Sequence, residues 1–138
     1  MPEFQKEGKF LGESGFNTKE DLEKLNTYKG QVTALAKNRQ EQKRLGEAGS
    51  KNVTTDIKTY GGVITNATDI EDALVSQGGY KGTEATKIRE ITQEKINQGY
   101  GNDSLKLARE QFNNQKNSEL GIQQTKIQDE FKGSGIED

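Results

Sequence analysis

The stretch that decides the fold runs from Lys51 to Gln77 and reads KNVTTDIKTYGGVITNATDIEDALVSQ. Read with helical spacing, the stretch places apolar residues at six of seven heptad positions, and the one exception is Glu71. The seven positions are Val53, Ile57, Tyr60, Ile64, Ala67, Glu71 and Leu74. This alternation of four-residue and three-residue steps predicts a helix through the whole stretch.

The first half of the same stretch also has the composition of a β-hairpin. Residues 53–66 are rich in Thr, Val and Ile, and Gly61 and Gly62 would form a two-residue turn between Tyr60 and Val63. The β-branched residues and the paired glycines cost a helix about 2 kcal/mol in propensity. Because the heptad pattern is nearly complete, we expect a helix here, and a hairpin around 53–66 is the alternative.

The second half of the stretch carries clearer helix signals. Thr68 and Glu71 have the spacing of a capping box, in which each side chain binds a free backbone N–H at the start of a helix. Gly78 and Gly79 then supply a helix stop. We therefore expect a helix from Thr68 to about Gln77.

Three further helices are predicted outward from this stretch. The first begins after a cap at Asn17 and ends near Gly46 or Gly49, and the second runs from about Thr83 to Gly99. The third begins at Asn102 or Asp103. Their apolar seams are narrow, and that of the second helix contains Ala85, Ile88, Ile91 and Ile96. The third helix has one stripe of Leu105, Ala108 and Phe112, and then a second stripe, shifted by one residue, of Leu120, Ile127 and Phe131. We expect the two halves of this helix to face different neighbours.

The predicted fold class is mainly α. We expect an extended N-terminal arm at 1–16, then a helical assembly domain at 17–132 with about four amphipathic helices joined at glycine-rich turns, then a polar tail at 133–138. In the arm, Phe4, Phe10 and Phe16 lie six residues apart among glycines, which suits neither a helix face nor a strand. We predict that they bind pockets on a neighbouring chain; folding back over the chain's own helices is the alternative.

Composition excludes a large private core and much chemistry. Leu, Ile, Val and Phe make up 27 of 138 residues, close to the level of about 20% below which chains tend to be disordered. The chain has no His and no Cys, which removes a zinc site, a thiol nucleophile and an imidazole base. We predict that the protein is not an enzyme and has no metal, cofactor or small-molecule substrate.

One basic cluster stands out near the end of the first helix. Lys37, Arg39, Lys43 and Arg44 form it, and the net charge of the whole chain is only −2. Cations at a helix C-terminus complement the helix dipole, which explains the cluster without any partner. A protein partner, or contact with DNA, is the functional alternative.

The chain resembles, in its overall texture, the small virion proteins of tailed bacteriophages. The resemblance lies in long polar helices such as residues 105–116, LKLAREQFNNQK, and in a total of 10 Asn and 12 Gln. It implies a multicopy structural protein of the internal, ejection or head-tail type, in contact with copies of itself, with other structural proteins and with DNA during DNA ejection.

The predicted function is therefore a non-enzymatic structural subunit of a large homo-oligomeric assembly, best assigned to a virion. Alternatives are a helical adaptor of a secretion or cell-surface complex, and a small nucleic-acid-binding protein. No signal peptide is expected from Met1 to Glu7, and no run of 18 apolar residues predicts a membrane span. We expect the chain to be made in a host cytoplasm and to reside in the virion.

Overall fold

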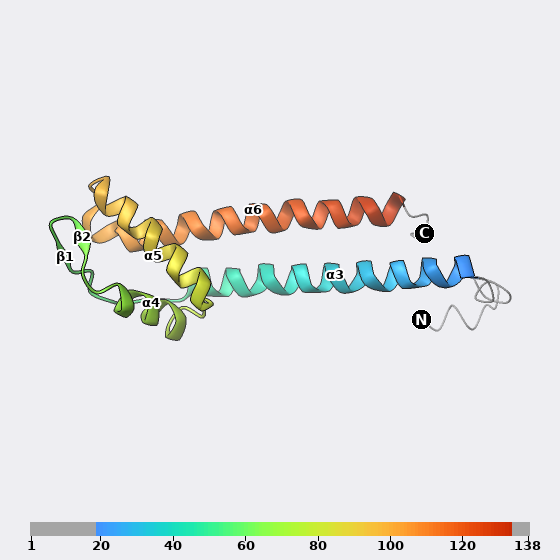
Figure 1. The fold of residues 1–138 in the computed structure, drawn as a ribbon, viewed down its shortest axis with the longest axis horizontal. Coiled ribbons are helices and arrows are strands. Elements are labelled where there is room, and N and C mark those ends of the chain that lie inside the picture. Colours follow the sequence, from blue (N-terminus) through green and yellow to red (C-terminus); the bar gives the residue numbers. More distant parts are fainter. Residues whose placement is uncertain (1–18, 134–138) are drawn as a thin grey trace. The chain divides into compact units, whose positions relative to one another are not determined.

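The computed structural model describes residues 19–133, so the predicted arm at 1–16 and residues 134–138 of the tail lie outside the described residues. Four α-helices and a small antiparallel hairpin make up the regular structure of this part of the chain. In chain order, the elements are α3 (Lys19–Ser50), β1 (Thr59–Tyr60), β2 (Val63–Ile64), α4 (Ala67–Ser76), α5 (Gly82–Asn97), the 3₁₀-helix η1 (Gly101–Asp103) and α6 (Ser104–Gly133) (Figure 1). The predicted mainly helical class is confirmed.

The predicted helix through 53–66 is wrong, and the alternative hairpin is the observed structure. Tyr60 pairs with Val63 and Thr59 pairs with Ile64 in antiparallel register. Gly61 and Gly62 both have positive φ, +61° and +82°, as a type I′ turn requires of its two central residues. The heptad pattern gave a false signal, because Tyr60 is 84% exposed and marks no buried helix face.

The start of α4 also differs from the prediction. The helix begins at Ala67, after Asn66, so Thr68 lies inside the first turn rather than at the cap. Glu71 binds the side chain of Arg89 on α5, with its Oε2 2.6 Å from Arg89 Nε. The predicted capping box of Thr68 and Glu71 is therefore not formed, and Glu71 instead joins α4 to α5.

The described residues divide into two compact units. We call residues 40–121 the core unit, and residues 19–39 together with 122–133 the two-helix unit. The core unit contains the end of α3, the hairpin, α4, α5 and the first part of α6.

A single hydrophobic core holds the core unit together. Its buried members are Leu45 and Ala48 from α3, Ile64 from β2, Ile70 and Leu74 from α4, Tyr80 from the loop after it, Ala85, Ile88 and Ile91 from α5, and Leu105, Ala108 and Phe112 from α6. The seams predicted for α5 and for the start of α6 are thus buried, apart from Ile96, which is only partly buried. The short helices α4 and α5 pack against each other (Figure 1).

Glycine ends α5 in the way the sequence predicts. Gly99 has a φ of +93°, the backbone N–H of Tyr100 donates to the carbonyl of Lys95 at 3.1 Å, and that of Gly99 donates to Ile96 at 3.0 Å. This is the Schellman motif, which satisfies the last carbonyls of a helix. The chain can therefore turn within a few residues from α5 into α6.

The two-helix unit has fewer buried residues than the core unit. Tyr28 of α3 contacts Phe131 of α6, with ring centroids 5.5 Å apart, and Asn38 Nδ2 donates to Gln123 Oε1 at 3.1 Å. Tyr28 precedes Asn38 in α3, whereas its partner Phe131 follows Gln123 in α6. The two helix segments therefore run antiparallel. Ile127 is buried and so is the polar Asn38.

Candidate functional site

The predicted basic cluster divides once its side chains are placed. Lys37, Arg39 and Lys43 are exposed on α3, as a partner-binding role requires. Arg44 is instead held within the chain by two carboxylates. The predicted anchors Phe4, Phe10 and Phe16 lie outside the described residues.

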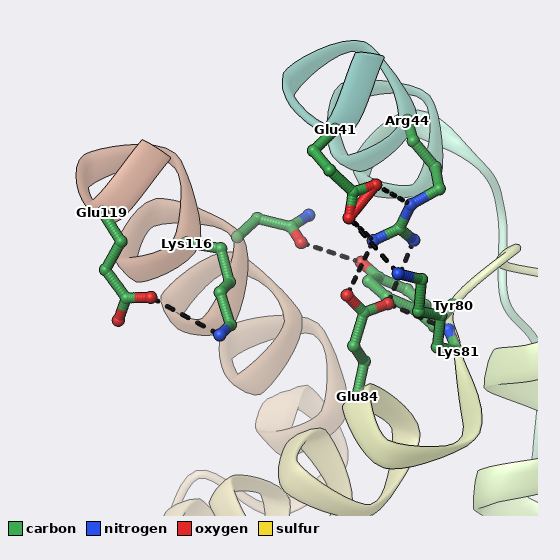
Figure 2. A network of polar contacts seen from close by, with 8 residues as sticks. Glu41, Arg44, Tyr80, Lys81, Glu84, Lys116 and Glu119 are labelled. Carbon is green, nitrogen blue, oxygen red and sulfur yellow. Dashed lines mark hydrogen bonds and ion pairs between the residues drawn. The ribbon is translucent and has the colours of Figure 1, made fainter. Parts of the chain in front are cut away.

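Arg44 joins α3 to the start of α5. Its Nε and Nη2 donate to the two carboxylate oxygens of Glu41 at 2.7 and 3.0 Å, and its Nη1 and Nη2 donate to those of Glu84 at 3.0 and 2.7 Å. Figure 2 shows the guanidinium between the two acids, with Lys81 beside Glu41. Glu84 Oε1 also accepts from the backbone N–H of Lys81, the residue before α5, at 2.9 Å.

The charges in this network favour its ionised form. Hydrogen bonds from Arg44 lower the pKa of Glu41 from 4.5 to about 2. Burial raises the pKa of Glu84, but hydrogen bonds from Arg44 and from the Lys81 backbone outweigh it and the pKa is lowered. Hydrogen bonds from Glu41 and Glu84 raise the pKa of Arg44. The network is a structural clamp between helices, with every member paired.

A second feature is the extended segment at 53–58, between α3 and the hairpin, whose backbone is bound by amide side chains. Gln77 accepts from the backbone N–H of Thr54 at 2.9 Å and donates to its carbonyl at 3.2 Å. Asn66 accepts from the N–H of Lys58 at 3.2 Å and donates to the carbonyl of Asp56. These two side chains stand where a neighbouring strand would be, and they bind four backbone groups along one edge of the segment.

The hairpin is held by a third amide. Gln93 of α5 accepts from the backbone N–H of Ile64 at 2.8 Å and donates to the carbonyl of Gly62 at 2.6 Å. Three amide side chains thus substitute for missing strands around the short sheet. The abundance of Asn and Gln in the sequence gave no indication of this backbone role.

A groove of about 580 Å³ lies along the extended segment. It is lined by Val53, Thr54, Thr55, Asp56, Ile57 and Lys58 of the segment, by Asn102 of η1, and by Leu105, Lys106 and Arg109 of α6. This volume is within the usual range for binding pockets. Sequence reasoning missed the groove, although exposed Thr54, Asp56 and Lys58 alternate with half-buried Val53, Thr55 and Ile57, a period of two that is typical of a strand.

Three cations and one carboxylate line this groove. Arg109 fixes one end, because its Nη2 donates to the carbonyl oxygens of Ala48 at 2.8 Å and Lys51 at 2.7 Å. Its Nε is buried and has no hydrogen-bond partner. Lys58 and Lys106 are exposed, and Asp56 is the only acid in the lining. The groove therefore favours a ligand with negative charge.

The third feature is apolar surface on the two-helix unit. Leu22 is 47% exposed, Val32 is 43% exposed and Ile122 is 71% exposed. Two helices bury only the facing seam, so side chains beside that seam need further helices to cover them. The unit therefore offers apolar surface for association.

Within residues 19–133, no group of three or more His, Cys, Asp or Glu side chains could hold a metal ion. No helix in that range is long and apolar enough to cross a membrane.

Comparison of the chain with protein families, with curated proteins and with solved structures finds no match.

Proposed function

We propose that the protein is a non-enzymatic structural subunit of a large multicopy assembly, and that this assembly is a bacteriophage virion, with an internal, ejection or head-tail role. The observation that supports it most is the exposed apolar surface of the two-helix unit. Leu22, Val32 and Ile122 are the residues concerned.

Burial of these side chains gives association a driving force. Full burial of a Val, Leu or Ile side chain contributes about 1.5 to 3 kcal/mol, and these three retain about half or more of their exposure. Covering all three would therefore contribute a few kcal/mol per chain. Helices supplied by further copies are the natural cover, because long polar helices with narrow seams associate into bundles.

The virion assignment draws on the resemblance of the polar helices to small virion proteins of tailed phages. Copies of the chain and other structural proteins are the proposed partners. Lys37, Arg39 and Lys43, which are exposed on α3, are the proposed contacts with DNA or with acidic protein surfaces, and Phe4, Phe10 and Phe16 are the proposed anchors on neighbouring chains.

Sedimentation velocity of the purified full chain tests the assembly, with a pair of matched valine variants. Val32 and Val75 are both helical and are 43% and 44% exposed, but Val75 lies on α4 in the core unit. Val32→Ser should weaken self-association about tenfold, which corresponds to about 1.4 kcal/mol, whereas Val75→Ser should leave it unchanged. A chain that sediments as a monomer up to millimolar concentration would rule out self-assembly.

The virion assignment needs its own experiment. Peptides of the chain should appear by mass spectrometry in phage particles purified from the host that carries the gene, at many copies per particle. Their absence from such particles, with the chain present in the infected cell, would contradict the assignment while leaving the assembly intact.

A further inference from the structure

The extended segment at 53–58 has one free backbone edge. In a strand, the backbone groups of successive residues point to opposite edges. Those of Thr54, Asp56 and Lys58 point to the edge occupied by Gln77 and Asn66. Within residues 19–133, the backbone groups of Val53, Thr55 and Ile57 make no hydrogen bond.

The residues of this free edge line the groove, as do Thr54, Asp56 and Lys58 of the same segment. Lys51 is also odd-numbered, and its carbonyl accepts a hydrogen bond from Arg109 of α6, which is part of the groove lining. Leu105 and Lys106 of the same helix complete this wall of the groove. An open strand edge beside a groove is the geometry of β-strand addition, in which main-chain hydrogen bonds hold an incoming segment and the lining selects its side chains.

We propose that this groove binds residues 134–138 of a second copy of the chain, Ser-Gly-Ile-Glu-Asp, as an added strand. Ile136 would contact the apolar lining of Val53, Ile57 and Leu105. Glu137 and Asp138 would meet Lys58, Lys106 and Arg109. The proposal rests on the proposed multicopy assembly and names one of its contacts.

The segment is assigned to a second copy because the proposed function is a multicopy assembly.

Such a contact joins unlike surfaces. The groove of one copy would bind residues 134–138 of the next copy. A contact of this type is heterologous, so it propagates from copy to copy into a ring or an open filament rather than closing as a symmetric dimer.

Disulfide cross-linking tests the contact, and the native chain is an ideal background because it has no cysteine. Full-length Thr54→Cys, in the groove, is mixed with full-length Ser134→Cys under mild oxidation. Ser118→Cys, an exposed position on α6 outside the groove, replaces Thr54→Cys in the control. The Thr54 and Ser134 variants should cross-link at least fivefold faster than the control pair, and Lys58→Glu with Lys106→Glu in the groove variant should remove that advantage.

Several results would overturn the proposal. Cross-linking no faster than in the Ser118 control would do so, and so would a rate unchanged by the two charge reversals. Faster cross-linking of Thr54→Cys to Ser14→Cys than to Ser134→Cys would assign the groove to the N-terminal arm instead. If Val32→Ser weakens self-association but no cross-link forms, the groove contact is wrong and the proposed assembly stands. If the cross-link forms but Val32→Ser leaves self-association unchanged, the groove contact stands and the apolar interface is wrong.

Discussion

Arg44 joins α3 to the start of α5 by ion pairs. It is 27% exposed and binds Glu41 and Glu84 through its whole guanidinium. Arg44→Ala should lower the free energy of unfolding by about 2 kcal/mol, because half-buried Glu84 loses its charged partner. Arg39→Ala, exposed on the same helix, is the control and should change it by less than about 0.5 kcal/mol. Urea denaturation measures both, and equal effects of the two variants would show that the clamp contributes nothing.

The same network predicts a dependence on pH. Glu41 has a pKa of about 2 in the folded chain against 4.5 as its ordinary value, so folding favours its ionised form. A carboxyl group with a lowered pKa stabilises the fold above its unfolded pKa, and this contribution is lost as the pH falls toward the folded pKa. Glu41→Gln should therefore lower the free energy of unfolding at pH 7. Between about pH 5 and pH 2, the free energy of unfolding of this variant should fall by less than that of the native chain. Thermal unfolding across this range measures the difference, and parallel curves would contradict the assignment.

The turn between β1 and β2 depends on glycine at two positions. Gly62 has a φ of +82°, so a side chain there is strained even though a Cβ would meet open space. Gly62→Ala should destabilise the core unit by about 1 kcal/mol. Gly46→Ala, which places a methyl group in open space within α3, should stabilise it by a similar amount because alanine favours a helix. Denaturation experiments measure the change in the free energy of unfolding of each variant. Changes of opposite sign would confirm the turn, and a stabilising Gly62→Ala would argue against it.

The hairpin also shows where sequence reasoning stops. Helix ends at Gly99 and the buried seams of α5 and α6 follow from local patterns, because each depends on residues within one or two turns. The choice between helix and hairpin at 53–66 depends on remote partners: Gln93 binds the hairpin from α5, and Ile64 is buried in a core built from four helices. A local heptad carries no information about either contact.

The candidate site was still harder to predict. Arg109, which lines the groove, binds the carbonyls of Ala48 in the last turn of α3 and of Lys51 just after it, across more than fifty residues of chain. The exposed cations of α3 were found from charge clustering, but Arg44 was included with them because clustering cannot reveal a partner as distant in sequence as Glu84. Alternation at 53–58 was the one local signal for an extended segment.

Hydrogen exchange should show the two edges of that segment. In the dissociated chain, the amides of Thr54 and Lys58 should exchange more slowly than those of Thr55 and Ile57, because only the first pair donates to side chains. NMR-detected exchange resolves the individual amides, and the difference should disappear in Gln77→Ala at Thr54 only. Uniform protection along 53–58 would contradict the described edge.

The two units of the molecule should also differ in local stability. The core unit has the buried cluster, whereas the two-helix unit has one buried apolar residue, Ile127, and a buried amide. Amides at 24–36 should therefore exchange at least tenfold faster than those at 85–92 in the dissociated chain, and should become protected on assembly. Mass-spectrometric exchange at two protein concentrations makes the comparison, and equal rates in the dissociated chain would show one cooperative unit.

The amide pair of the two-helix unit has a mechanical consequence. Asn38 is 3% exposed and donates to Gln123 on the opposite helix. If the helices slid past each other by one turn, about 5.4 Å, that hydrogen bond would break, at a cost of about 0.5 to 1.5 kcal/mol. Leucine at position 38 would remove this barrier. The native pair thus resists axial sliding of the two helices. A pulling force along the helices must break this specific hydrogen bond before the helices can shift.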